Sequence, residues 1–366
     1  MKSKKYKILK WTLGTLASII ILLICLGFWI KSLVPPRQIE MESSKTDDLA
    51  YVTRNIPEPR GKILAVVTST STMGTSGKST GYELTELARA YYVFTANGFE
   101  VDIASPLGGK PPVVIDDEDM GEYDYAFLND SEAQHKANNT IKIDNVITTD
   151  YEAVYFVGGK GAMFDFPNNA AIQAIIKEYY QERKVIGAVC HGPAALVNVT
   201  LDNGQYLVEN KTVSSFTNKE ELLLISDAET IFPFLLQDKL IEGGARFNEG
   251  SMYLEKMSHD DHLITGQNPW SVWVLAETMI KQLGYTPKTR PITGEENAVS
   301  VLLTYEREGI DKAKALMEHI MHEKKEPMSR LLVTKHSIIG VMKGDVKRFT
   351  NILRLASYAK KLDSRE

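Results

Sequence analysis

Residues 185–195 (VIGAVCHGPAA) constrain the fold of this chain more than any other stretch. A run of strand-forming residues leads directly into Cys190 and His191, and Gly192 and Pro193 then begin a helix-forming segment. This order predicts a strand, a sharp turn with the cysteine at its corner, and a helix. Because a helix N-terminus lowers the pKa of a nearby thiol, the position favours a nucleophilic Cys190 with His191 beside it. The alternative is that Cys190 is a small buried apolar residue.

The same strand belongs to a longer alternation of strands and helices that begins at Lys62. The candidate strands are Ile63–Thr68, Glu100–Ala104, Ala153–Val157, Val185–Val189 and Thr212–Phe216. The candidate helices lie around Gly81–Asn97, Asn168–Tyr180, Pro193–Val199, Lys219–Lys239 and Trp270–Leu283. Such alternation predicts an α/β fold with a doubly wound parallel sheet, in which sites lie at the carboxyl ends of strands. Cys190 follows a strand at such an end.

The N-terminus carries a candidate membrane anchor. Five lysines lie within residues 1–10, and Trp11–Ile30 is then an uncharged, mostly apolar run of twenty residues. This run matches the thickness of a bilayer and ends without a small-residue cleavage site, which favours an uncleaved signal anchor over a cleaved signal peptide. The lysines predict a cytoplasmic N-terminus and an extracytoplasmic main domain. Residues 31–60 are polar and interrupted by prolines, and they are expected to form a tether.

A second helical region is expected after the main α/β domain, which we place at residues 61–284. We expect residues 285–294 to form a linker and residues 295–366 to form a small all-α extension. Its predicted helices are Asn297–Arg307, Asp311–His322, Arg330–Met342 and Val346–Lys361. An interaction or assembly role, with a protein partner bound through this tail, is the expectation for the extension.

Charge and cysteine content limit the possible partners. Residues 61–284 contain 16 Lys and Arg against 31 Asp and Glu, a net charge of −15. An acidic domain of this kind argues against nucleic-acid binding, because that affinity comes largely from neutralising phosphates. Cys25 lies in the candidate span, so Cys190 is the single cysteine of the globular part and no disulfide framework is possible there.

Six short motifs, found in the same order, resemble those of the ThiJ/PfpI superfamily. They are Thr80–Glu86 (TGYELTE), Gly98–Gly109, Gly158–Gly161 (GGKG), Ala188–Pro193, Phe216–Glu221 and Leu263–Pro269. Within that superfamily the chain looks most like the branch of heat-shock-protein-31-type chaperones and glyoxalase III enzymes. The resemblance covers about residues 61–284, and it implies a flavodoxin-like, class I glutamine-amidotransferase-like fold. The membrane span, the tether and the helical tail lie outside it.

The resemblance also implies roles for individual residues. Cys190 is similar to the family's nucleophile, His191 to its general base and Glu86 to the helix-borne glutamate that faces the thiol. Glu221 fits the third, orienting position best, although its neighbour Glu220 is an alternative. The backbone N–H groups of Gly159 and His191 would form an oxyanion hole. Lys160 replaces a histidine of many relatives, and it is expected either to bind an anionic substrate group or to cover the rim of the pocket.

These roles imply a glutathione-independent glyoxalase, a lyase that converts a 2-oxoaldehyde such as methylglyoxal into a 2-hydroxy acid. Neither a cofactor nor a metal is expected, because the enzyme supplies its own thiol. A cysteine amidase or peptidase is an alternative that uses the same residues. A chaperone-like or redox-sensing scaffold is another, since the chemistry that activates a thiol also favours its oxidation. A homodimer is a further expectation.

Overall fold

The computed structural model describes residues 2–36, 39–117 and 119–364. The chain forms two compact units. One comprises residues 1–37 and 292–366, and the other comprises residues 38–291.

The larger unit is built on a seven-stranded sheet with the order β10-β11-β7-β6-β1-β3-β5. The strands of this sheet are β1 (Lys62–Val66), β3 (Glu100–Ser105), β5 (Ile141–Lys142), β6 (Ala153–Phe156), β7 (Val185–Val189), β10 (Met257–Asp260) and β11 (Leu263–Gly266). All neighbours pair in parallel except β10 and β11, which are antiparallel. Every residue of β6 and β7 is buried, as expected for central strands of a sheet covered on both faces.

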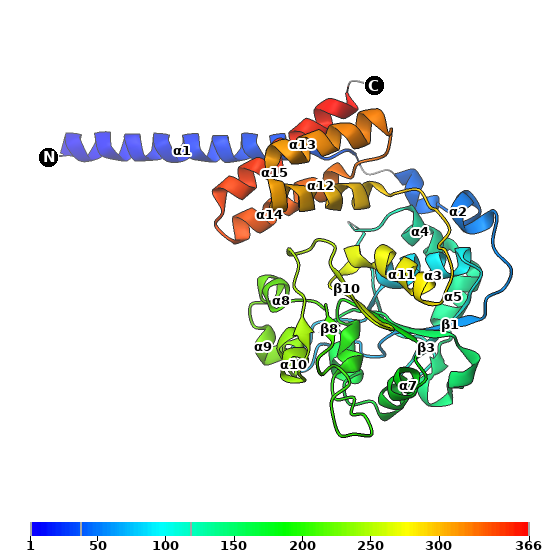
Figure 1. Ribbon diagram of the computed structural model, residues 1–366. Helices are drawn as coiled ribbons and strands as arrows, with labels where there is room; N and C mark the ends of the chain where they lie inside the picture. Colours follow the sequence, from blue (N-terminus) through cyan, green and yellow to red (C-terminus); the bar gives the residue numbers. More distant parts are fainter. Residues whose placement is uncertain (1, 37–38, 118, 365–366) are drawn as a thin grey trace. The chain divides into compact units, whose positions relative to one another are not determined.

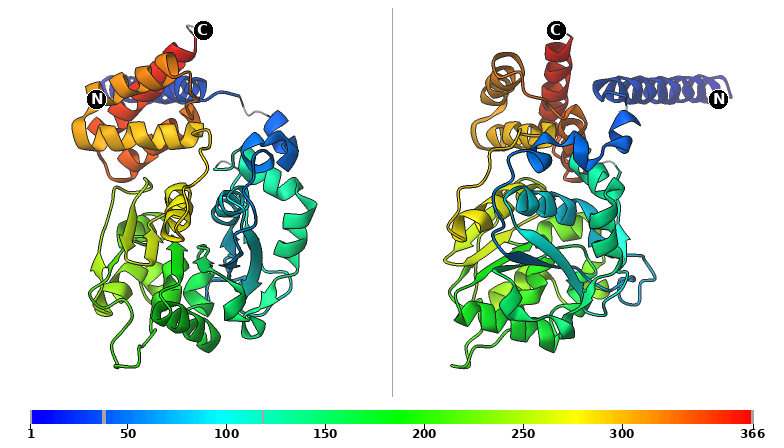
Figure 2. Two further views of the ribbon diagram at one scale, coloured as in Figure 1. Left: turned by 45° about the vertical axis from the view of Figure 1, so that its right-hand side comes forward. Right: turned by 90° about the vertical axis from the view of Figure 1, so that its right-hand side faces the viewer.

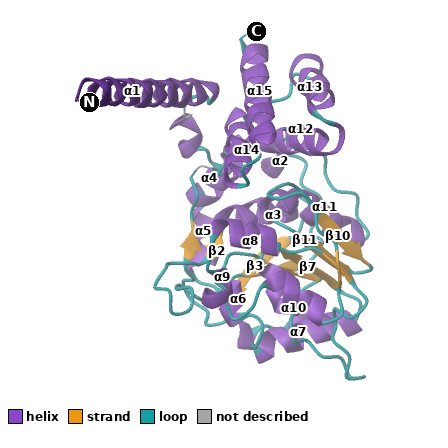
Figure 3. Cartoon of the chain, turned by 90° about the vertical axis from the view of Figure 1, so that its left-hand side faces the viewer, coloured by secondary structure: helices purple, strands orange, loops and turns teal. Residues whose placement is uncertain are grey.

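Helices cover both faces of this sheet. They are α3 (Leu84–Ala96), α4 (Glu122–Asn129), α5 (Ser131–Asn138), α6 (Ala162–Asp165), α7 (Ala170–Gln181), α8 (Asn218–Leu224), α9 (Ala228–Ile231), α10 (Leu236–Glu242) and α11 (Val272–Gln282). The strands lie between α3 and α11 on one side and α7 and α10 on the other (Figures 1 and 3). Two further views show the same layers (Figure 2). The predicted doubly wound, flavodoxin-like α/β fold is therefore confirmed.

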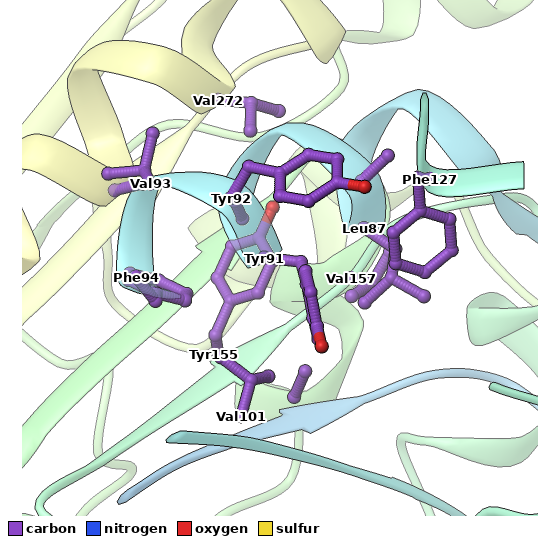
Figure 4. Close-up of a cluster of buried hydrophobic side chains, with 14 of the residues drawn as sticks. Leu87, Tyr91, Tyr92, Val93, Phe94, Val101, Phe127, Tyr155, Val157 and Val272 are labelled. Atoms are coloured by element: carbon purple, nitrogen blue, oxygen red, sulfur yellow. The ribbon is translucent and has the colours of Figure 1, made fainter. Parts of the chain in front are cut away.

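Alternate residues of the strands lie on opposite faces of the sheet and contribute to two separate hydrophobic cores. Ile63 and Ala65 of β1 face the core shared with α3 and α11, whereas Leu64 and Val66 face the core shared with α7. In the first core, aromatic side chains of α3 pack edge-to-face with their neighbours (Figure 4). Tyr92 lies against Phe127 of α4 and Phe94 against Tyr155 of β6, which fixes α3 on the sheet.

Several elements differ from the sequence prediction because tertiary contacts shape them. Pro193–Val199, expected as a helix, contains only a 3₁₀ turn, Gly192–Leu196. Lys219–Lys239, expected as one helix, is divided into α8, α9 and α10. Thr212–Phe216 contributes only β8 (Thr212–Val213), which pairs with β9 (Arg246–Phe247) outside the main sheet. A further small sheet joins β2 (Tyr82–Glu83) to β4 (Val113–Val114).

The segment expected as a tether is largely folded onto the larger unit. It contains 3₁₀ turns at Ile39–Ser43 and Thr46–Asp48 and the short helix α2 (Ala50–Thr53). Leu49 and Tyr51 are buried in the core that contains α3. In addition, the Thr46 hydroxyl donates to the Asp130 carboxylate at 2.7 Å. These few apolar residues are too widely spaced to give a periodic signal, so the sequence pattern alone reads as a linker.

The smaller unit contains the N-terminal helix α1 (Lys2–Leu33) and the C-terminal helices α12 (Gly294–Glu308), α13 (Ile310–Glu318), α14 (Arg330–Met342) and α15 (Val346–Asp363). A π-helical turn, His319–Glu323, follows α13. Within α1, Trp11–Leu33 is long and apolar enough to cross a membrane. Helices α14 and α15 form an antiparallel hairpin. The expected all-α extension is present.

Candidate active site

Cys190 lies immediately after β7, at the carboxyl end of the sheet. Its φ is +58°, a left-handed conformation that is strained for a residue with a side chain. Two backbone hydrogen bonds hold it there, since its N–H donates to the Gly266 carbonyl and its carbonyl accepts from the Phe216 N–H, both at 2.9 Å. The predicted sharp corner is present, and the paired backbone fixes the position of the thiol.

A chain of hydrogen bonds connects Cys190, His191 and Glu221. Cys190 Sγ lies 3.3 Å from His191 Nδ1, and His191 Nε2 lies 2.5 Å from Glu221 Oε2. All three side chains are buried. The ring of Phe216 packs against the imidazole with centroids 4.6 Å apart and the ring planes tilted by 33°, which restricts the rotation of the imidazole. Burial acts to raise the pKa of the Glu221 carboxyl, but the charge and hydrogen bond of His191, together with Lys160, outweigh it and lower the pKa, so Glu221 carries a negative charge at neutral pH.

The neighbouring Glu220 points away from His191 and is fully occupied elsewhere. One carboxylate oxygen accepts from the Thr217 N–H and hydroxyl at 3.0 and 2.8 Å. The other accepts from the N–H of Tyr253 and from the amides of Gln267 and Asn268, at 2.7, 3.0 and 3.1 Å. Thr217 also caps α8, and this capping box sets the direction of both glutamates. Of the two candidates, Glu221 is the one that contacts the histidine.

Glu86 approaches the thiol from α3. Its carboxylate oxygen Oε2 accepts from the Gly158 N–H at 2.8 Å, and its carbonyl accepts from the Tyr155 hydroxyl at 3.0 Å. The carboxyl is completely buried, and this burial, reinforced by the nearby Glu83, raises its pKa well above the usual value. This raised pKa favours the protonated carboxyl, which can donate a hydrogen bond toward Cys190 or toward a bound substrate.

The pKa of the Cys190 thiol is raised, contrary to the lowered value that its position in the sequence predicts. Burial is the largest cause, and the proximity of the Glu86 and Glu83 carboxyls adds to it, while Lys160 acts in the opposite direction. The segment that follows is a five-residue 3₁₀ turn, which does not offer the dipole of a full α-helix. The resting thiol is thus protonated, and forming the thiolate requires a proton acceptor such as His191.

The loop after β6 lies beside the thiol. Gly159 has a φ of +108°, and a Cβ atom there would overlap the carbonyl oxygen of Gly81, so only glycine fits. Among the residues that the structure describes, neither the Gly159 N–H nor the His191 N–H has a hydrogen-bond acceptor. Two unused N–H donors next to a cysteine can stabilise negative charge on a substrate oxygen.

Glu83 is a residue of this site that the sequence analysis missed. It ends β2 just before α3, and burial raises the pKa of its carboxyl to about 7, while the nearby Lys160 opposes that rise. Glu83, Glu86 and Lys160 together influence the pKa of the thiol. The spacing of Glu83 and Glu86, three residues apart at a helix start, was the signal that could have placed both at one site.

Comparison with known proteins assigns the family. The model of the DJ-1/PfpI family matches residues 78–282, which include every residue of the site described above. The chain belongs to the DJ-1/PfpI family. The resemblance drawn from the six sequence motifs is thereby confirmed.

Individual relatives cover the α/β region. A glutathione-independent glyoxalase of Schizosaccharomyces pombe is 29% identical over 217 residues, which are 57% of this chain and 90% of that protein. The crystal structure of glyoxalase III from Candida albicans is 28% identical, with a TM-score of 0.55. The match covers 61% of this chain and 97% of the Candida chain. The Rapid Encystment Protein 24 KDa of Francisella tularensis is 37% identical, with a TM-score of 0.58. The match covers 61% of this chain and 99% of the Francisella chain.

Proposed function

We propose that this chain is a glutathione-independent glyoxalase that converts a 2-oxoaldehyde, such as methylglyoxal, into a 2-hydroxy acid by means of Cys190. The observation that carries the proposal is the buried line of contacts from Cys190 Sγ to His191 Nδ1 at 3.3 Å and from His191 Nε2 to Glu221 at 2.5 Å. The names of the relatives, among them a glutathione-independent glyoxalase and glyoxalase III, support the reaction class.

In the first step, the Cys190 thiol gives its proton to His191 and the sulfur adds to the aldehyde carbon. The negative charge of Glu221 stabilises the imidazolium that forms, which offsets the raised pKa of the thiol. Addition places a negative charge on the former aldehyde oxygen. The N–H groups of Gly159 and His191 are suited to bind that oxygen until His191 returns the proton to it and gives a hemithioacetal.

In the second step, the proton on the former aldehyde carbon moves to the neighbouring ketone carbon, while the hydroxyl group on the former aldehyde carbon gives up its proton and the ketone oxygen gains one. We assign the base to His191, which is neutral again, and the proton donor for the ketone oxygen to Glu86, because burial raises the pKa of its carboxyl and favours the protonated form. The hemithioacetal thereby becomes a thioester of the 2-hydroxy acid. Water then cleaves the thioester, which releases the acid and restores the thiol. The sum is the addition of one water, without oxidant or reductant.

Burial of the thiol favours a small substrate. Cys190 is only 4% exposed, so a peptide chain would have to displace the surrounding residues before it reached the sulfur. This argues for a small carbonyl compound over the amidase or peptidase alternative. Lys160 lies close enough to lower the pKa values of Glu83 and Cys190, which supports a role for it in attracting a substrate with a negatively charged group.

The test uses the full chain purified in detergent, without glutathione. Methylglyoxal loss and lactate formation are measured for the parent, for Cys190→Ala and for Cys25→Ala as the matched control. The parent and Cys25→Ala should turn over alike, and Cys190→Ala should form no lactate above background. Lactate formation that survives Cys190→Ala would refute the proposal. If the parent forms no lactate but suppresses protein aggregation, the scaffold alternative holds instead.

We also propose that α1 anchors the enzyme in a membrane with the N-terminus in the cytoplasm. The length and apolar character of Trp11–Leu33 and the five lysines before it support this. Resistance of the full chain to alkaline extraction from membranes would be expected, and release into the soluble fraction would contradict the anchor. Reporter fusions at the C-terminus would test the orientation.

A further inference from the structure

The tip of the α14–α15 hairpin carries a cluster of exposed apolar side chains. Ile338, Val341 and Met342 of α14 are 55%, 60% and 50% exposed, and Val346, the first residue of α15, is 72% exposed. Their spacing at i, i+3 and i+4 places the three α14 residues on one face of the helix. The turn between the helices is tight, since the Asp345 N–H donates to the Gly340 carbonyl at 2.8 Å. We call these four residues the tip cluster.

The tip cluster is not needed to hold the helices together. The residues of α14 and α15 that pack inside the smaller unit are different ones, among them Leu332, Val333, Ile339 and Leu355, all of which are buried. Large apolar side chains gathered on a surface with no role in the core mark a binding site. The question is what covers them.

The charge of the hairpin indicates a negatively charged partner. The hairpin, residues 330–363, contains eight Lys and Arg against two Asp, a net charge of +6. Lys343 and Lys347 flank the tip cluster, and both are exposed. Both acids are engaged: Asp345 is the N-cap of α15, where its carboxylate accepts from the Arg348 N–H at 2.8 Å, and Asp363 pairs with Arg330 at 3.0 Å, away from the tip. Apolar side chains bordered by lysines are typical of surfaces that lie in the headgroup region of anionic membranes.

The other end of the hairpin is attached to α1. Leu33, the last residue of α1, is buried within the same unit, and the Lys360 Nζ of α15 donates to the Ser32 hydroxyl at 3.2 Å. The hairpin is therefore fixed to the end of the helix that we propose to cross the membrane. A membrane is the negatively charged partner that this attachment brings within reach.

We infer that the tip cluster inserts into the surface of the membrane that α1 spans, with Lys343 and Lys347 contacting anionic lipid headgroups. The inference rests on the proposed membrane anchor. It gives the C-terminal extension a function of its own, because a helical unit held at two points cannot rotate freely about α1.

The experiment uses the full chain reconstituted into vesicles that contain phosphatidylglycerol. In a Cys25→Ala, Cys190→Ala background, Val341→Cys carries an environment-sensitive NBD label, and Ser300→Cys on the exposed face of α12 is the matched control. The label at 341 should shift to shorter wavelength and be quenched by lipids brominated in their acyl chains, and the label at 300 should do neither. Replacing Lys343 and Lys347 by Gln should reduce the inserted-to-free ratio about fivefold for each lysine.

The outcomes separate the two proposals. If alkali extracts the chain from the vesicles, the anchor itself fails. If the chain resists extraction but the label at 341 is not quenched by brominated lipid, the anchor stands and the insertion of the tip cluster is refuted. A shift at 341 that increases with protein density, without quenching by lipid, would also refute insertion, because a second copy of the chain would then cover the cluster.

Discussion

Replacing Glu221 by Gln removes the charge that faces His191 while the size of the side chain hardly changes. The contact is 2.5 Å long and buried, and hydrogen bonds to charged groups contribute about 1.5–3 kcal/mol. Because 1.36 kcal/mol corresponds to a tenfold change in rate, kcat/KM for methylglyoxal should fall by about 10- to 150-fold. A glutamine can also donate to Nε2, which would place the imidazole proton on Nδ1 and prevent it from accepting the proton of Cys190.

Glu220→Gln is the matched control, and its expected effect is on stability. Whichever oxygen of Glu220 becomes an amide nitrogen, it faces at least two donors, from Thr217 or from Tyr253, Gln267 and Asn268. With about 1–3 kcal/mol for each buried donor left unpaired, the free energy of unfolding should fall by about 2–6 kcal/mol. The folded fraction of this variant should retain a kcat/KM close to that of the parent.

Both variants are measured by lactate formation without glutathione and by urea unfolding, with activity expressed per folded molecule. Glu221→Gln should lose turnover with a modest change in unfolding, and Glu220→Gln should show the reverse. If Glu220→Gln loses turnover at full stability while Glu221→Gln keeps it, the assignment of the orienting carboxylate is wrong. If neither changes kcat/KM, no carboxylate supports His191 in the reaction.

Three further predictions concern the same site. Glu83→Gln should lower the pKa of the Cys190 thiol and Lys160→Met should raise it, as measured by the pH dependence of iodoacetamide alkylation, and shifts of the same sign would contradict this account. Burial raises the pKa of Glu86 above its unfolded value of 4.5, so its contribution to stability is complete below that pH and declines as pH rises toward the folded pKa. In urea unfolding, the free energy of unfolding of the parent should decline with pH by up to about 1.4 kcal/mol per pH unit, and Glu86→Gln should abolish this decline. Equal slopes for the parent and the variant would argue against a raised pKa. Gly159→Ala should lower the free energy of unfolding by roughly 2 kcal/mol or more, because the new methyl group overlaps the Gly81 carbonyl; an unchanged Tm would contradict this.

The central strands could be predicted from the sequence because they are buried on both faces. Val185–Val189 and Ala153–Phe156 are continuous apolar runs, and their order with the intervening helices predicts the doubly wound sheet. Strand β5, in contrast, has two residues, Ile141 and Lys142, which is too short for any periodic pattern. The division of Lys219–Lys239 into three helices also depends on how each piece packs against the sheet.

Within the site, the motifs point to the residues that meet but not to their electrostatics. The corner at Cys190 is visible in the sequence because a strand, a cysteine and a glycine-proline pair follow one another. The direction of the thiol pKa could not be predicted, since it depends on burial and on carboxyls brought from α3 and β2. In the sequence, Glu83 cannot be told from an ordinary surface glutamate, because its surroundings form only in the folded chain.

The solitary position of Cys190 determines what oxidation would do to this protein. The chain has one other cysteine, Cys25, which lies in the apolar stretch of α1. A sulfenic acid formed at Cys190 would therefore have no second thiol in the larger unit with which to form a disulfide, the reaction that protects oxidised cysteines from further damage. Recovery would require a small thiol from outside that can enter the site. Without such a thiol, peroxide would inactivate the protein permanently. How long the protein remains active would then depend on the burial that keeps the resting thiol protonated.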